Sequence, residues 1–314
     1  MGYVFAEKSD VERTQPPRLE AMCDPVTTDV PARLDGSRVL TRAYRFPLNG
    51  STVPPGQPLL EISGVGLRFG EIQALDNVGL TVVAGSVHAV IGPNGAGKSS
   101  LLNCVSGLYR PYCGQIRLNR DGEAVSLLGR RPHQIARLGV ARSFQNIELF
   151  KHLTVLENLM LGRHTRMSKA LLPALLWFGP ARRQEITHRE YVEEVINLLE
   201  LQAVRHKPVG TLAYGYAKRV ELGRAVCLQP AVLLLDEPMA GMNAEEREYM
   251  ARYILDVNEL RGVTVVVIEH DMDVVMDISH RVTVLDFGKL IADGSPDEVR
   301  GDPAVIEAYL GEQS

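Results

Sequence analysis

Nine residues of this chain, GPNGAGKSS at positions 92–100, restrict its fold more than any other stretch. They match the pattern G-x-x-x-x-G-K-[ST] at Gly92, Gly97, Lys98 and Ser99. The apolar run SVHAVIG leads into them, and helical periodicity begins directly after them. An ordinary glycine-rich turn is the alternative, but it would not explain this pattern between a strand and a helix. The sequence therefore predicts a phosphate-binding loop that joins a buried strand to a helix.

The predicted loop has the groups that bind the phosphates of a nucleotide. Consecutive N–H groups of a glycine-rich turn point inward at an anion, and the start of the following helix adds its unpaired donors. Lys98 would reach the β- and γ-phosphates, and the hydroxyl of Ser99 would bind Mg²⁺. The loop residues expected at the nucleotide are Gly92, Pro93, Asn94, Gly95, Ala96, Gly97, Lys98, Ser99 and Ser100. The chain is thus expected to bind a nucleoside triphosphate.

Buried strands and helical segments alternate along the chain. The runs AVLLLD (231–236) and VTVVVIEH (263–270) are continuously apolar until their ends, which is typical of strands covered on both faces. Helical periodicity lies between the strands. The residues expected to share a helix face are Leu101, Leu102, Val105 and Leu108 in one helix, and Val192, Val195, Ile196 and Leu199 in another. This alternation predicts an α/β fold with a mostly parallel sheet.

Two further elements are predicted to be antiparallel. The segments LLEISGVGLRF and ALDNVGLTVV have the composition of neighbouring short strands. Near the C-terminus, RVTVLDFGKLIADGS is expected to form a hairpin with Gly288–Lys289 at its turn.

The first 57 residues differ from the rest because they are rich in proline and lack periodicity, which predicts a flexible extension.

The net charge of −4 gives the chain no basic field, so no nucleic-acid partner is expected. The four scattered cysteines suit reduced thiols of a cytosolic protein. The longest lipid-like stretch, ALLPALLWFG (170–179), is about half the length of a membrane span. A buried helix and a contact with a membrane subunit are equally good interpretations of that stretch.

Polar residues follow the later strands at their carboxyl ends, where the ligands of parallel sheets gather. Asp236 is expected to hold the Mg²⁺ of the phosphate loop, and Glu237 to polarise the water that attacks the γ-phosphate. His270 ends a later strand in the same way and is expected near the γ-phosphate. Gln145, in ARSFQNIELF, could contact the metal or the attacking water with its amide. A plain strand end followed by a turn is the alternative for the acids.

The stretch TLAYGYAKRVELGRA (211–225) places Gly215 between two tyrosines at an expected helix start. In the order Phe69, GPNGAGKS, Gln145, LAYGY, LLLDEP, AGMN and His270, these motifs resemble those of the ATP-binding-cassette (ABC) ATPases. The resemblance runs from about Leu59 to the C-terminus. It implies that ATP and Mg²⁺ are the cofactors and that adenine stacks on Phe69.

The resemblance also implies the fold. An ABC ATPase domain at 58–314 would be a P-loop NTPase with a RecA-like parallel-sheet core, an antiparallel β subdomain and a helical subdomain at about 146–225. Two cassettes would bind head to tail, so that each ATP lies between one subunit's phosphate loop and the other's signature turn. The signature turn of this chain is Ala213, Tyr214 and Gly215, and the N–H of Gly215 would face the partner's γ-phosphate. Because the signature helix and the acid-bearing strand are consecutive, their spacing is constant.

The signature departs from the usual Leu-Ser-Gly-Gly-Gln. Ala213 replaces the serine, Tyr214 replaces the first glycine, and Tyr216 replaces the glutamine. LAYG, FGEIQALDNV, AGMN with its Asn243, and AVIEAYLGE are similar to stretches of the ATPase subunits of branched-chain amino acid importers. Tyr216 departs even from that subfamily. It could weaken one of two composite sites, in which case Tyr216→Gln should preserve or raise ATPase activity.

The resemblance implies a transporter motor that imports branched-chain amino acids or related small solutes. Its partners would be a second ABC ATPase subunit, multi-span permease subunits and an extracytoplasmic solute-binding protein, and it would lie on the cytoplasmic face of the cell membrane. A lipid-type ABC exporter subunit and a soluble ABC ATPase that acts on ribosomes or DNA are the alternatives. A P-loop kinase or GTPase would leave the signature and His270 without roles.

Overall fold

The computed structural model describes residues 51–143, 149–163 and 180–310 of the chain. The strands are β1 (Pro58–Phe69), β2 (Ile72–Val83), β3 (Val87–Ile91), β4 (Cys113–Arg120), β5 (Glu123–Ser126), β6 (Val140–Arg142), β7 (Val232–Asp236), β8 (Thr264–Ile268), β9 (Arg281–Asp286) and β10 (Lys289–Gly294). The helices are α1 (Lys98–Val105), α2 (Pro132–Leu138), α3 (Val155–Arg163), α5 (Pro180–Leu198), α6 (Tyr214–Val226), α7 (Ala244–Glu259), α8 (Met272–Ile278), α9 (Pro296–Arg300) and α10 (Pro303–Leu310), with 3₁₀ turns η2 (Gln202–Val204) and η3 (Val209–Thr211).

A six-stranded sheet in the order β10-β9-β3-β8-β7-β6 forms the centre of the fold. Neighbouring strands of this sheet run parallel to each other, except that β10 is antiparallel to β9. Every residue of β3, β7 and β8 is buried, which confirms that the three continuous apolar runs are strands covered on both faces. The predicted α/β fold with a mostly parallel sheet is therefore confirmed.

A second, antiparallel sheet has the order β2-β1-β4-β5. Its first pair is the predicted one, with Pro58 opposite Val83 and Phe69 opposite Ile72. The strands β4 and β5 were not predicted, because polar residues interrupt their apolar pattern and most of their side chains face outward.

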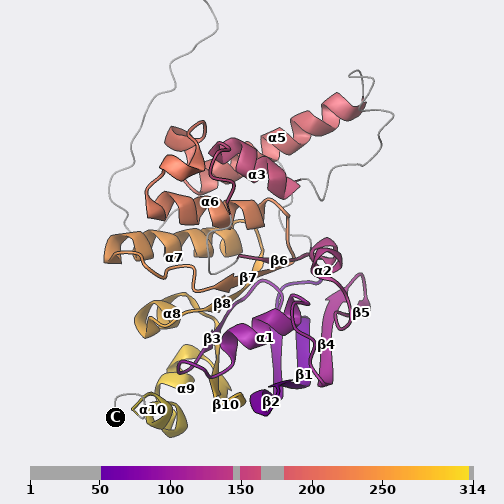
Figure 1. Ribbon diagram of the computed structural model, residues 1–314, viewed down its shortest axis with the longest axis vertical. Helices are drawn as coiled ribbons and strands as arrows, with labels where there is room; N and C mark the ends of the chain where they lie inside the picture. The colour runs from indigo at the N-terminus through magenta and orange to yellow at the C-terminus, as the bar shows by residue number, and fades with distance from the viewer. Residues whose placement is uncertain (1–50, 144–148, 164–179, 311–314) are drawn as a thin grey trace, which may run out of the picture. The chain divides into compact units, whose positions relative to one another are not determined.

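Two hydrophobic clusters cover the two faces of the central sheet. One joins alternate residues of β3 to α5, α6 and α7, and the other joins Val90 to α1 and the antiparallel sheet. Figure 1 shows α6 and α7 on one side of the strands and α1 on the other. Both predicted helix faces are buried with one exception. Leu108 is exposed because α1 ends at Val105, before Gly107, whose φ of 77° turns the chain away from the helix.

The C-terminal hairpin is present, but its predicted turn was placed one residue too late. Lys289 pairs with Asp286 as the first residue of β10, so Phe287 and Gly288 form the turn. Their φ angles are 41° and 76°, as a type I′ turn requires. Gly288 N–H donates to Ala96 O at 3.1 Å, and Asp76 N–H donates to Gly288 O at 2.7 Å. The turn therefore braces the loop that precedes α1.

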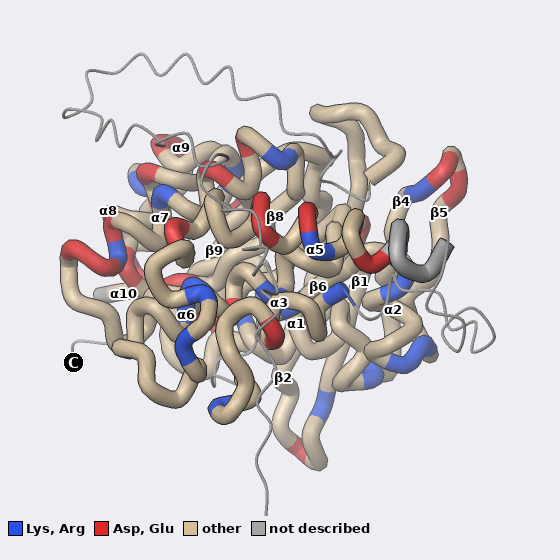
Figure 2. Tube along the Cα trace, turned by 90° about the horizontal axis from the view of Figure 1, so that it is seen from above, with Lys and Arg blue, Asp and Glu red and all other residues tan. Residues whose placement is uncertain are grey.

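Charged residues of both signs occur along the strands and helices (Figure 2). None of the helices within the described residues is long and apolar enough to cross a membrane. The described part of the predicted helical subdomain contains α3, α5, η2, η3 and α6 and no strand longer than a single bridge. The division into domains itself stays a prediction.

Candidate nucleotide site

The loop from Gly92 to Gly97 joins β3 to α1, and two of its glycines have no room for a side chain. Gly92 has a φ of 143°, and a Cβ atom there would lie 1.9 Å from Leu285 O. Gly97 has a φ of 101°, and its Cβ would lie 2.6 Å from Ala74 O. The loop is thus held closely against β9 and β2, in a backbone conformation that only glycine adopts without strain.

Lys98 points back into this loop from the first turn of α1. Its side chain is buried, and Nζ donates to Gly92 O at 2.6 Å and to Pro93 O at 2.9 Å. Asn94 and Gly95 are exposed, and nothing lies within 4 Å of a Cβ placed on Gly95. A buried ammonium group next to exposed backbone of the loop suits the binding of the negatively charged phosphates of a nucleotide. Ser100, on the same turn, is half-buried.

Asp236 lies at the carboxyl end of β7 and faces the start of α1. The carboxylate is almost fully buried, and Ser99 Oγ donates to its Oδ1 at 3.2 Å. Among the described residues there is no group of three or more His, Cys, Asp or Glu that could hold a metal ion. This small set of oxygens nevertheless fits Mg²⁺, which commonly takes one or two protein ligands and completes its shell with phosphate oxygens and water.

Glu237 and His270 lie opposite each other just beyond the carboxyl ends of the neighbouring strands β7 and β8. His270 Nε2 is 2.5 Å from Glu237 Oε1, and the parallel register pairs Asp236 with Ile268 directly behind them. Glu237 has a φ of 50°, and its N–H donates to Ile268 O at 3.0 Å. A glutamate in the left-handed region is uncommon and tends to occur at functional sites.

Glu269 holds the backbone of His270 and of the turn after Glu237, and it was not predicted. Its buried carboxylate accepts the N–H of Met239 at 2.7 Å and the N–H of His270 at 3.3 Å. Burial raises the pKa of the Glu269 carboxyl, and the two N–H donors oppose this. An acid at the end of an otherwise apolar strand was the available signal in the sequence.

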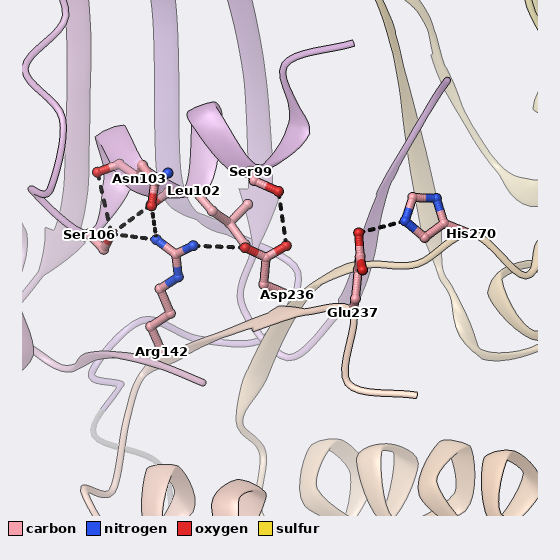
Figure 3. A network of polar contacts seen from close by, with 8 residues as sticks. All are labelled: Ser99, Leu102, Asn103, Ser106, Arg142, Asp236, Glu237 and His270. Carbon is pink, nitrogen blue, oxygen red and sulfur yellow. Dashed lines mark hydrogen bonds and ion pairs between the residues drawn. The ribbon is translucent and has the colours of Figure 1, made fainter. Parts of the chain in front are cut away.

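Arg142, the last residue of β6, was also not predicted. Its guanidinium NH2 donates to Asp236 Oδ2 at 2.8 Å, and NH1 donates to Asn103 Oδ1 at 2.5 Å and to Ser106 Oγ at 3.0 Å. Figure 3 shows this side chain reaching from its strand to both the carboxylate and the end of α1, with the Glu237–His270 pair to one side.

Phe69 lies at the end of β1, 45% exposed, where its ring meets the ring of Tyr109 edge-on at 5.1 Å. An exposed aromatic face here is available to a planar base. Gln145 lies outside the described residues.

The signature turn makes its contacts with another part of the chain. Ala213 caps α6, and Tyr214 OH donates to Ala240 O at 3.0 Å. Gly215 is buried, and a Cβ there would lie 2.6 Å from Glu246 Oε1. A larger residue at position 215 would therefore displace the carboxylate of Glu246.

Comparisons with known proteins account for this arrangement. A model of the family described as ABC transporter matches residues 75–240, and one described as branched-chain amino acid ATP-binding cassette transporter matches residues 289–314. The chain belongs to the ABC transporter family and is one of its ATP-hydrolysing cassettes.

Within that family, the chain is similar to proteins of branched-chain amino acid transport. It is 42% identical to the high-affinity transport ATP-binding protein BraF of Pseudomonas aeruginosa (strain ATCC 15692) and 39% identical to LivG of Escherichia coli (strain K12). Each alignment covers 82% of this chain and 99% of the relative.

Solved structures of ABC cassettes have the same fold. An ATP-binding cassette in its ADP conformation has a TM-score of 0.69 at 29% identity and matches 81% of this chain and 99% of its own. A dimeric post-hydrolysis cassette bound to ADP and phosphate has a TM-score of 0.62 at 25% identity, over 76% of this chain and 99% of its own. The predicted P-loop NTPase fold of an ABC cassette is confirmed.

Proposed function

We propose that this chain is the ATP-hydrolysing motor subunit of a membrane importer of branched-chain amino acids or related small solutes. The observation that carries the proposal is its 42% identity to a branched-chain amino acid transport ATP-binding protein over 99% of that protein's length. The match of residues 289–314 to the model specific to this group supports the same reading. Neither a lipid exporter nor a soluble ABC ATPase has comparable support.

ATP binds with its phosphates in the Gly92–Ser100 loop and its adenine against Phe69. Lys98 exchanges the carbonyl oxygens it now contacts for phosphate oxygens, which neutralises part of their charge. Ser99 and Asp236 would hold Mg²⁺, and Gln145 would be a further ligand. When bound, Mg²⁺ would draw charge from the phosphate oxygens and so lower the barrier to attack on the γ-phosphorus.

Glu237 acts as the general base of hydrolysis. Its carboxylate takes a proton from water as the water oxygen bonds to the γ-phosphorus, and ADP leaves with the electrons of the broken bond. His270 Nε2 donates to Glu237 and keeps it oriented. The second ring nitrogen of His270 would face the γ-phosphate. The left-handed backbone at Glu237 fixes the direction in which the side chain leaves β7.

The chain acts within an assembly. Two cassettes close head to tail, so that the Ala213–Gly215 turn of one completes the ATP site of the other. The dimeric state of a similar cassette structure supports the pairing of two cassettes. Permease subunits that cross the cell membrane hold the cassettes at its cytoplasmic face, and a solute-binding protein delivers the amino acid from outside.

The test is Glu237→Gln in the complex purified from its own membranes. The variant should bind ATP as tightly as the unchanged chain, while hydrolysis and ATP-driven leucine uptake into vesicles fall at least about 100-fold, the usual contribution of a general base. Glu248→Gln, an exposed glutamate on α7, is the matched control and should leave both unchanged.

The two parts of the proposal fail in different ways. Unchanged hydrolysis in Glu237→Gln would remove this residue from the role of base. Hydrolysis that depends on Glu237 in a complex without permease subunits, as judged by mass spectrometry, would keep the ATPase and refute the transport function.

A further inference from the structure

Five side chains and one helix form a closed ring beside the phosphate loop. α1 begins with Lys98 and Ser99, and Ser99 contacts Asp236. Asp236 pairs with Arg142, and Arg142 returns to α1 through Asn103 and Ser106. The ring therefore joins β7, β6 and both ends of α1 (Figure 3).

The two oxygens of Asp236 are divided between these neighbours. Oδ2 accepts from Arg142 NH2 at 2.8 Å, and Oδ1 accepts from Ser99 Oγ at 3.2 Å. A carboxylate can rotate about its Cβ–Cγ bond, so a partner fixed on one oxygen determines where the other points. Arg142 thereby leaves Oδ1 on the side of Ser99 and the phosphate loop.

Arg142 is itself held in place. Its side chain is 9% exposed and that of Asp236 is 3% exposed, so the pair has little solvent to screen it. Hydrogen bonds from NH1 to Asn103 and Ser106 fix the plane of the guanidinium group, which a lysine ammonium could not match with the same geometry. Because the NH1 side of the Arg142 guanidinium is held rigidly, its NH2 side can orient the carboxylate of Asp236.

We propose that Arg142 is a positioning residue for the Mg²⁺ that accompanies the nucleotide. It does not touch the metal, but orients Asp236 so that one carboxylate oxygen faces the metal position beside Ser99. Residues that hydrogen-bond to metal ligands commonly change metal affinity by about 10- to 100-fold when they are removed. This inference rests on the proposed function, because it assumes that Ser99 and Asp236 bind the metal.

A purely structural role predicts something else. If Arg142 only compensated the buried charge of Asp236, its removal would lower the free energy of unfolding. It would not change how much Mg²⁺ strengthens nucleotide binding by the folded protein. The two roles are separated by measuring the affinity for ADP with Mg²⁺ and with EDTA in the same folded variant.

The experiment uses the full-length chain and a fluorescent ADP analogue, titrated in EDTA and in increasing Mg²⁺. In Arg142→Gln the affinity in EDTA should stay within about twofold, and the Mg²⁺ concentration for half-maximal tightening should rise about 10- to 100-fold. Mn²⁺ added to the ADP complex and followed by electron paramagnetic resonance should show the same weakening directly. Arg142→Lys should recover part of the loss, because it keeps the charge but not the fixed plane.

Two further variants keep the test decisive. Asn103→Ala removes one anchor of the guanidinium and should shift the Mg²⁺ requirement in the same direction by less, even if Arg142→Gln does not fold. Arg281→Gln removes an arginine paired with Asp293, in another part of the fold, and should not shift it.

An unchanged Mg²⁺ requirement in folded Arg142→Gln or Asn103→Ala would overturn the positioning role alone. An unchanged chain whose ADP affinity does not respond to Mg²⁺ would instead refute the metal site of the proposed function.

Discussion

His88 makes the stability of this protein depend on pH through a single buried ring. The side chain, on β3, is fully buried, and Nε2 lies 2.7 Å from Thr283 Oγ1. Since Thr283 donates its own proton to Asp293, its oxygen accepts from His88, which places the imidazole proton on Nε2. Nδ1 is buried with no hydrogen-bond partner among the described residues. Protonation would therefore place a second N–H where nothing accepts it.

The loss of stability at low pH can be calculated from the difference between the pKa of His88 in the folded and unfolded chain. Burial lowers the pKa of His88 from 6.5 to about 4, with Arg281 lowering it further and Asp293 opposing the shift. Because the folded pKa is lower than the unfolded one, the unfolded chain binds the proton first, and stability falls as the pH drops from about 6.5 to about 4. Between about pH 7 and pH 5 the loss is about 2 kcal/mol, and its limit below pH 4 is about 3 kcal/mol.

The assay compares the unchanged chain with His88→Gln by urea unfolding at several pH values. Glutamine keeps a donor for Thr283 but does not titrate, so the difference in unfolding free energy between the two chains should change by about 2 kcal/mol over this range, in favour of the variant at low pH. His133→Gln, an exposed histidine on α2, is the control and should show a difference of less than about 0.5 kcal/mol. A His88→Gln difference that is independent of pH would refute the neutral buried imidazole.

The remaining predictions concern the signature and the phosphate loop. The guanidinium of Arg219 lies 4.9 Å from the ring centre of Tyr216, so Tyr216→Gln should lower the free energy of unfolding by about 0.5–1 kcal/mol, whereas Tyr216→Phe keeps the contact. An unfolding free energy of Tyr216→Gln equal to that of the unchanged chain would contradict this. Gly97→Ala should cost about 1–3 kcal/mol and lower ADP affinity at least about tenfold, because it adds both a strained φ and a clash. Gly122→Ala, with a φ of 82° and open space, isolates the strain and should leave ADP affinity unchanged in the same titration.

The sequence predicted elements whose signal is local. β3, β7 and β8 are continuous apolar runs, and the loop before α1 needs glycine at fixed positions, so residue types alone locate them. The end of α1 and the hairpin turn were misplaced because backbone angles decided them. Gly107 ends the helix, and Phe287 adopts a positive φ that is unusual for an aromatic residue.

Residues that act through distant partners were harder to predict. Arg142 and Asp236 are separated by 94 positions, and Glu269 lies 30 positions from Met239, so no local motif contains either pair. β6, which carries Arg142, has only three residues and hence no measurable periodicity. The motif residues could be predicted one by one from the sequence. The residues that orient them, Arg142 and Glu269, could be identified only once the packing of the sheet was known.

The parallel register between β7 and β8 limits how the chain can change in length. Asp236 stands beside Ile268, Glu237 follows Asp236 directly, and His270 follows Ile268 by two positions. Adding or deleting one residue within either strand would turn the following side chains to the opposite face and separate the pair. Insertions in the turn before α7 would leave this register untouched, whereas insertions within α7 would rotate its buried face away from the sheet. Gene fusions, tags and evolutionary insertions should therefore be tolerated between the two strands far more readily than within them, and their positions in new sequences would indicate which chains retain a working hydrolytic pair.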